Sequence, residues 1–141
     1  MKSEQTVFYY IERAIKSYRQ FVQRNITEKG FETTIDQGLI LSIIQNNPGI
    51  TQQQIAIAAF KDHASVTRII ENLVSKQILK REFHAEDRRR FHLTITPYGL
   101  KMLQQMKPVV NAYRKKALQG ITAQEIELVK NILHRISENC Q

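Results

Sequence analysis

The spacing of apolar residues constrains this chain most, because it is helical at both ends and strand-like over one short stretch between them. From Val7 to about Glu28, apolar residues recur in steps of three and four, which only a helix places on one face. A helix of roughly 22 residues is about 33 Å long, more than one small core needs to cover. The pattern predicts a long amphipathic helix and suggests a partner chain; its stripe is Phe8, Ile11, Ile15, Tyr18, Val22 and Ile26.

Two short helices in the middle of the chain are predicted to pack as a pair. A helix over roughly 35–45 precedes them. Thr51 and Gln54 have the form of a capping box and predict a short helix that starts there. Asp62 is a good N-cap for the next helix, over about 63–76. Short helices joined by a tight connection form the helix-turn-helix arrangement.

The apolar period changes to two after this pair. Residues 79–84 and 90–95 alternate between apolar and polar side chains, which is typical of strands. The connection between them, 85–89, is polar throughout, as an exposed loop should be. The sequence therefore predicts a two-stranded hairpin directly after the helix pair.

Two helices are predicted to close the chain. Thr96 supplies an N-cap with Pro97 at the first helical position, which opens a long helix toward Leu118. Thr122 and Glu125 form a capping box for a final helix to about residue 139. Heptad-like stripes at both ends favour packing on each other and on a second copy, with a bundle inside one chain as the alternative. The last stripe is Ile126, Val129, Leu133, Ile136 and Cys140.

Composition limits the partners. The 141 residues suit one domain, and 21 Lys and Arg against 13 Asp and Glu give a net charge of +8, which favours polyanions as partners. No apolar run approaches the ~20 residues of a membrane span, and the first residues lack the apolar core of a signal peptide. We therefore expect a soluble, cytoplasmic protein with no membrane partner.

The outward face of the 63–76 helix is suited to a DNA groove. Its apolar residues face the core. Small residues on the other side let a backbone approach a groove, hydroxyls reach phosphates or bases, and Arg68 can contact guanine. The alternative is a solvated polar face. The outward residues are Ala64, Ser65, Thr67, Arg68, Glu71 and Asn72.

The hairpin connection carries the densest positive charge. Arg88, Arg89 and Arg90 form a narrow cationic probe suited to the negative potential of a minor groove. Alternation should point Arg88 and Arg90 one way and Arg89 the other. Asp87 can hold one guanidinium in a fixed orientation. The alternative is a loop that is merely soluble.

Enzyme chemistry is not indicated. The sequence shows no metal-ligand spacing, no nucleophile with a base at a defined spacing and no glycine-rich phosphate loop, so we expect neither catalysis nor a cofactor or metal. Cys140 lies on an apolar stripe and is expected to be a buried small hydrophobe. A solvated pair across the hairpin is the expectation for His84 and His92. The histidines are His63, His84, His92 and His134.

The sequence resembles the MarR family of winged helix-turn-helix transcriptional regulators. The matching segments are 48–52, 55–56, 64–73, 87–89 and 93–99. Asp87 and Arg89 fit the family's wing signature, and the Leu-Thr-x-x-Gly that follows is matched with Ile95 in place of Leu. The family usually has Gly where this chain has Gln77, so either that turn differs or a strained left-handed residue is tolerated there.

The resemblance implies a mainly α fold with a small β-hairpin wing. The winged helix-turn-helix would span 35–96 of a single domain, with dimerisation helices at 1–30 and 97–141. It implies a homodimer on a pseudo-palindromic operator in double-stranded DNA, most often as a repressor. The assigned DNA-binding residues are Thr51, Gln52, Ala64, Ser65, Thr67, Arg68, Asn72, Arg88, Arg89 and Arg90, with Asp87 supporting the wing.

A small-molecule effector pocket between the dimerisation and DNA-binding parts is also common in this family, and its residues are not assigned here. Two other functions stay open. A winged helix can serve protein–protein contact, which the polar outward face and the arginine triplet disfavour. A helical enzyme would need a catalytic constellation, and the sequence carries none.

Overall fold

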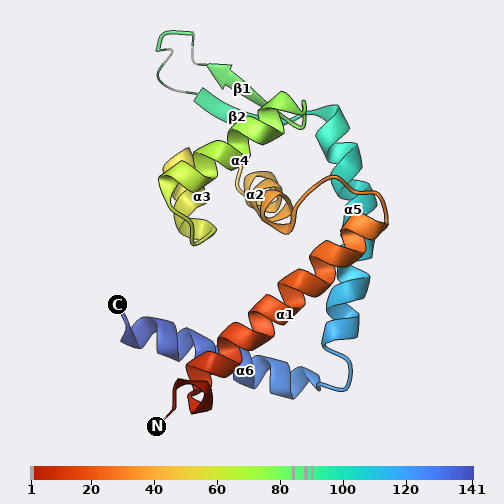
Figure 1. The fold of residues 1–141 in the computed structure, drawn as a ribbon. Helices are drawn as coiled ribbons and strands as arrows, with labels where there is room; N and C mark the ends of the chain where they lie inside the picture. Colours follow the sequence, from red (N-terminus) through yellow and green to blue (C-terminus); the bar gives the residue numbers. More distant parts are fainter. Residues whose placement is uncertain (1, 84, 88, 90) are drawn as a thin grey trace.

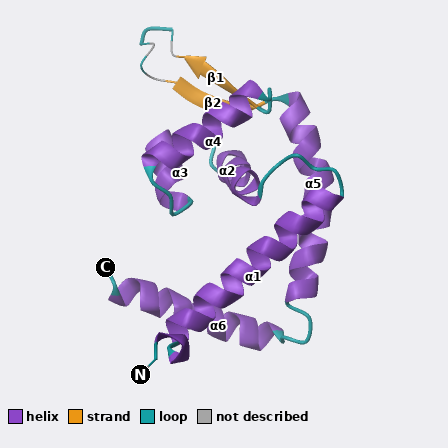
Figure 2. Cartoon of the chain, viewed as in Figure 1, coloured by secondary structure: helices purple, strands orange, loops and turns teal. Residues whose placement is uncertain are grey.

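The computed structural model describes residues 2–83, 85–87, 89 and 91–141. The helices and the hairpin follow the predicted order, with bounds within about one residue of those expected (Figures 1 and 2). A short 3₁₀ helix over Ser3–Gln5 precedes the first long helix. The elements are α1 (Val7–Glu28), α2 (Ile35–Asn46), α3 (Gln52–Ala58), α4 (His63–Ser75), β1 (Leu79–Phe83), β2 (Phe91–Ile95), α5 (Pro97–Ala117) and α6 (Ala123–Asn139).

Side-chain caps fix where most helices begin. The capping boxes predicted at Thr51 and Thr122 are both present, as are the N-caps at Asp62 and Thr96. A further capping box starts α2, where Thr34 pairs with Gln37, three residues into the helix. These hydroxyl and carboxylate oxygens satisfy backbone N–H groups that have no partner inside the helix. The caps therefore account for the close agreement between predicted and observed bounds.

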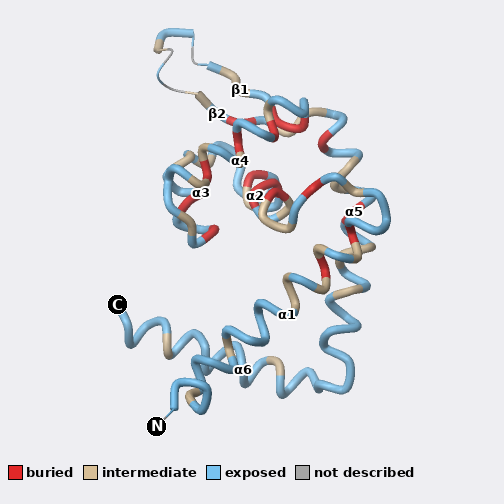
Figure 3. The backbone as a smooth tube through the Cα atoms, in the orientation of Figure 1, coloured by how far each residue is buried: buried red, intermediate tan, exposed pale blue. Residues whose placement is uncertain are grey.

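The buried residues form two clusters. The larger lies under α2, α3, α4 and the base of the hairpin, and Ile40, Ile55 and Leu73 are fully buried within it. The smaller one joins α1 to α5 through Val22, Ile26 and Met106. Figure 3 shows the buried segments in the upper body and along the upper parts of α1 and α5, whereas α6 is almost entirely exposed. The fold is a winged helix with long terminal helices.

Gln77 adopts the strained left-handed conformation, which is one of the two alternatives that the sequence left open for this turn. Its φ is 62°. The Gln77 N–H donates to the Val74 carbonyl at 3.0 Å, and the Ile78 N–H donates to the Leu73 carbonyl at 2.9 Å, the pair of bonds that defines a Schellman cap. The turn thus has the Schellman form, and the strain of a non-glycine residue there, about 1–2 kcal/mol, is tolerated.

Gly99 allows the start of α5 to sit on the end of the helix-turn-helix. A Cβ at Gly99 would lie 2.5 Å from the Ile78 carbonyl oxygen, so no larger residue fits. The Thr96 hydroxyl donates to the Gln77 carbonyl at 2.6 Å, and the Thr96 N–H donates to the Ile78 carbonyl at 3.0 Å. Together these contacts clamp the hairpin, α4 and α5 at one junction.

One expectation from the sequence is wrong, and another stays a prediction. The helix α6 ends at Asn139, so Cys140 is its C-cap and is exposed rather than a buried member of the stripe. The strand register pairs His92 with Glu82, whose Oε2 lies 2.8 Å from His92 Nε2, because residues opposite each other in an antiparallel ladder share a face. His84, the partner expected for His92, lies outside the described residues.

None of the helices in the described residues is long and apolar enough to cross a membrane. Over the same residues, no group of three or more His, Cys, Asp or Glu side chains is placed to hold a metal ion.

Candidate nucleic-acid interface

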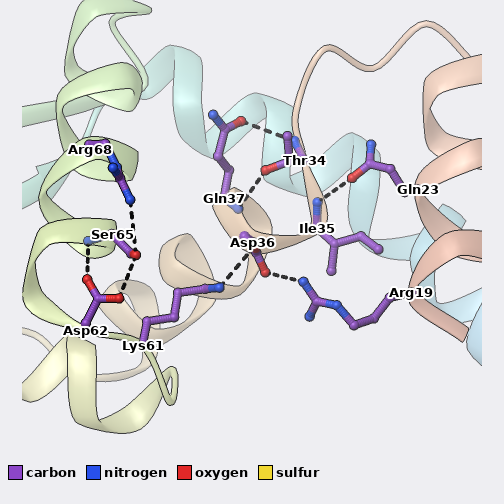
Figure 4. Close-up of polar contacts among 10 residues, drawn as sticks. All are labelled: Arg19, Gln23, Thr34, Ile35, Asp36, Gln37, Lys61, Asp62, Ser65 and Arg68. Atoms are coloured by element: carbon purple, nitrogen blue, oxygen red, sulfur yellow. Dashed lines mark hydrogen bonds and ion pairs between the residues drawn. The ribbon is translucent and has the colours of Figure 1, made fainter. Parts of the chain in front are cut away.

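The exposed face of α4 carries an arginine that its neighbours orient. The Arg68 guanidinium donates to the Ser65 hydroxyl at 3.4 Å, and that hydroxyl donates to Asp62 Oδ2 at 2.9 Å. Asp62 also accepts the Ser65 backbone N–H at 2.7 Å. Figure 4 shows this chain running along the first turns of α4. These contacts hold Arg68 on the outward face in the N-terminal half of α4. The N-terminus of a helix favours an anion such as a phosphate group.

Asp62 is an ionised cap. The backbone N–H and the hydroxyl of Ser65 both hydrogen-bond to it, which lowers the pKa of its carboxyl below the usual value. The positive charge of Arg68 acts in the same direction. A carboxylate at this place complements the helix dipole and fixes Ser65. Ser65 therefore orients Arg68 as well as lying on the outward face.

Three assigned residues bond to one another or to their own helices. Gln52 Nε2 donates to the Thr67 hydroxyl, which links the first turn of α3 to α4, and it also lies 3.3 Å from His63 Nε2. The Thr67 hydroxyl donates to the His63 carbonyl. The Thr51 hydroxyl accepts the Gln54 N–H as a helix cap. The polar side-chain atoms of Thr51, Gln52 and Thr67 thus have hydrogen-bond partners within the fold. Ala64 is exposed and has no polar side-chain group.

Asn72 is exposed, but its side chain also contacts α2. Its Oδ1 accepts a hydrogen bond from Gln37 Nε2 at 2.8 Å. Gln37 is buried, with 7% of its surface exposed. The structure thus gives Asn72 a partner in the fold that the sequence pattern did not suggest.

The wing presents one described arginine with an acidic support. Asp87 Oδ1 accepts the Arg89 backbone N–H at 3.0 Å and lies 3.6 Å from Arg89 Nε. The Arg89 side chain is 95% exposed, and the support of the wing by Asp87 stays a prediction that these contacts agree with. At the base of the wing, the Arg81 guanidinium lies over the Phe91 ring at 5.5 Å. Arg88 and Arg90 lie outside the described residues.

An ion-pair chain that the sequence did not reveal connects α1 to the helix-turn-helix. Asp36, in the first turn of α2, pairs with Arg19 of α1 and with Lys61 in the turn between α3 and α4 (Figure 4). Partial burial raises the pKa of Asp36, but hydrogen bonds from Arg19 and Lys61 outweigh it and hold that pKa below the usual value. These residues are 17 and 25 positions apart from Asp36, so no local pattern signals them.

A cavity lies beside this chain, between α1 and the start of α2. It is a shallow hollow that is largely open to solvent, with a volume of about 520 Å³. Two arginines and one aspartate line it, and the Arg19–Asp36 pair forms part of its wall. The lining residues are Arg19, Gln20, Gln23, Arg24, Thr34, Ile35 and Asp36.

Comparison with known proteins identifies the family. Residues 33–91 match the model of the MarR family. A protein of Thauera aromatica, proposed as the transcriptional regulatory protein for the hcr operon, is 33% identical over 98 residues. That alignment covers 68% of this chain and 57% of the relative, so the chain matches little more than half of the relative's length. Residues 33–91 of this chain thus form a MarR-family segment.

Solved structures extend the likeness to nearly the whole chain. BpsR of Bordetella bronchiseptica, described with the regulation of its DNA binding by 6-hydroxynicotinic acid, has a TM-score of 0.85 at 21% identity, covering 97% of this chain and 96% of its own. MepR of S. aureus, solved as a DNA complex, has a TM-score of 0.84 at 22% identity, covering 95% and 98%. At these identities the likeness establishes the fold. The expectation that the chain is not an enzyme agrees with its family.

Proposed function

We propose that this chain is a homodimeric transcriptional regulator that binds a pseudo-palindromic operator in double-stranded DNA and acts as a repressor released by a small ligand. The observation that carries the DNA-binding part is the oriented Arg68 on the outward face of α4, with the exposed Arg89 on the wing. Arginine at both places suits base contact in a major groove and charge in a minor groove. MepR, which shares the fold, was solved as a DNA complex, which is consistent with DNA binding by this chain.

Dimerisation rests on apolar side chains that the single chain leaves in solvent. They lie on the first turn of α1 and along α6, away from both buried clusters. Large apolar side chains gathered on exposed helix faces are typical of protein interfaces. A two-fold dimer would place two copies of α4 on two half-sites of DNA. The residues include Val7, Phe8, Tyr10, Leu128, Val129, Ile132 and Leu133, each more than a third exposed.

Ligand release rests on the cavity between α1 and α2. Arg19 and Arg24 make it suitable for an anionic ligand, such as an aromatic carboxylate. A carboxylate bound there would compete with Asp36 for Arg19 and so weaken the tie between α1 and the helix-turn-helix. The regulation of BpsR by 6-hydroxynicotinic acid is consistent with this class of ligand.

The test is a mobility shift with the purified full chain. Duplexes enriched from a randomised library should bind at least about a thousandfold more tightly than random duplex of the same length, the lower end of the range for specific DNA binding. Added aromatic carboxylates should then be screened for release of that complex. A chain that binds enriched and random duplexes equally, or neither, contradicts the proposal, and failure to bind any duplex would favour the protein–protein alternative.

A further inference from the structure

The carboxamide of Gln37 connects the start of α2 to the outward-facing helix α4. Its Oε1 accepts the Thr34 backbone N–H at 3.1 Å, while its own backbone N–H donates to the Thr34 hydroxyl at 3.1 Å. Its Nε2 donates to Asn72 Oδ1 at 2.8 Å. Gln37 therefore closes a capping box with one end of its amide and reaches α4 with the other.

The capping hydrogen bond from Thr34 fixes the orientation of the Gln37 side-chain amide. A backbone N–H can meet only an acceptor, so the oxygen of the Gln37 amide faces Thr34 and its NH₂ group faces Asn72. The atom of Asn72 that accepts from this NH₂ group must in turn be its oxygen. No buried side-chain nitrogen or oxygen in the described residues lacks a partner, which agrees with this assignment.

This arrangement restricts what Asn72 can do on DNA. Asparagine reads adenine through two bonds at once, donating from its NH₂ group and accepting on its oxygen. One of the two lone pairs on the Asn72 oxygen accepts from Gln37, so only the other lone pair and the NH₂ group are left for a base edge. The hydrogen bond from Gln37 therefore restricts how Asn72 can meet a base directly.

Asn72 is well placed to control Arg68 instead. The two residues are four positions apart on α4, so they are neighbours on one helix surface. A hydrogen bond at Asn72 opposes rotation of α4 about its own axis, and Arg68 projects from the adjoining turn. On the other side, the Gln23 side chain of α1 accepts the Ile35 N–H at 2.9 Å, which ties the same first turn of α2 to α1 (Figure 4).

We propose that Gln37 is a positioning residue that sets the rotation of α4 through Asn72, and so sets which bases Arg68 meets. This inference rests on the proposed sequence-specific DNA binding. Gln37 itself touches no DNA in this account. Asn72 serves as the acceptor of the hydrogen bond from Gln37 rather than as a residue that reads a base.

The experiment is motif selection from a randomised duplex library, followed by affinity measurements on the selected and random duplexes. The variants are Asn72→Ala, Gln37→Met, their double mutant and Asn72→Asp, with Glu71→Ala as a neighbouring exposed control. Asn72→Ala and Gln37→Met should each reduce the ratio of selected to random affinity about 2- to 10-fold, the equivalent of one hydrogen bond. The double mutant should lose no more than Gln37→Met alone, because Gln37→Met already removes the contact with Asn72 together with the capping bond to Thr34.

Asn72→Asp distinguishes the hydrogen bond with Gln37 from direct base reading by Asn72. Its carboxylate oxygen still accepts from Gln37 Nε2, so the selected motif should match that of the parent, while the added charge weakens both duplexes alike. Glu71→Ala should shift both affinities together and leave the motif unchanged. Thermal melting adds a second readout. Asn72→Ala should lower the midpoint because it leaves the buried Gln37 donor unpaired, whereas removing a free asparagine from an exposed helix position would be neutral or raise it.

The outcomes separate this inference from the proposed function. A parent that selects no motif overturns both. If Gln37→Met still selects the parent motif, Gln37 does not position α4. The same conclusion follows if Asn72→Asp and Asn72→Ala change the motif alike. Both results leave sequence-specific binding by the parent intact. If Gln37→Met does not fold, the comparison of Asn72→Asp with Asn72→Ala decides alone.

Discussion

Asp36 and Lys61 form a salt bridge, with Lys61 Nζ 3.1 Å from Asp36 Oδ2, that joins α2 to the turn of the helix-turn-helix. The same carboxylate pairs with Arg19 of α1. One side chain thus connects a long terminal helix to the two helices of the candidate DNA-binding surface. All three side chains are partly shielded from water, so the pair should contribute more than a fully exposed one.

Asp36→Asn should lower the free energy of unfolding by about 1–2 kcal/mol, because both cations lose their partner. Urea unfolding followed by circular dichroism measures it. Glu12→Gln is the matched control, since Glu12 pairs with Lys16 on the exposed surface of α1, and it should change the same quantity by less than about 0.5 kcal/mol. Equal effects of the two substitutions would show that the Asp36 cluster has no special role.

The contribution of Asp36 to stability should depend on pH. The pKa of Asp36 is lower in the folded chain than its ordinary value, so its contribution is complete above about pH 4 and disappears as pH falls through the lowered folded pKa. The difference in unfolding free energy between the parent and Asp36→Asn should therefore be largest near pH 6 and shrink below about pH 4. A difference that stays constant down to pH 2.5 would argue against an ionised, paired Asp36.

Gln77→Gly should stabilise the fold. Relief of the left-handed strain gains about 1–2 kcal/mol, and the greater freedom of glycine in the unfolded chain returns about 0.5–1. The expected net gain is about 0.5–1 kcal/mol in urea unfolding. Gln77→Ala removes the same side chain but keeps a Cβ at φ 62°, so it should bring no gain. A gain from alanine equal to that from glycine would mean that strain is not the cause.

The helices, the hairpin and their caps could be read from the sequence because each depends on neighbours in the chain. Thr51 with Gln54 and Thr122 with Glu125 are local patterns, and local patterns placed the helix starts correctly. The partners of Asn72, Asp36 and Arg19 are set by packing between helices that are distant in sequence. The exposed position of Asn72 on its helix was predicted, but its contact with Gln37 required the tertiary structure.

Dimerisation should depend on the apolar stripe of α6. Light scattering at micromolar concentration should report twice the 16.5 kDa of the chain. Leu133→Lys, which places a charge on that stripe, should shift the protein toward the monomer. Ile57→Lys is the control, because Ile57 is 70% exposed on α3, away from the terminal helices, and it should leave the dimer intact. A parent that is monomeric and still binds enriched duplex tightly would refute the dimer.

The most direct measurement of the whole account compares Arg68→Ala and Arg89→Ala on enriched and random duplexes over a salt series. Arg68→Ala should cost about 1–3 kcal/mol on the enriched duplex and much less on random DNA, because it removes a base contact in the major groove. Arg89→Ala should weaken both duplexes by similar factors and reduce the salt slope by about one unit, because a wing arginine in the minor groove acts mainly through charge. The account is contradicted if Arg68→Ala weakens both duplexes equally while Arg89→Ala removes only the binding to the enriched one.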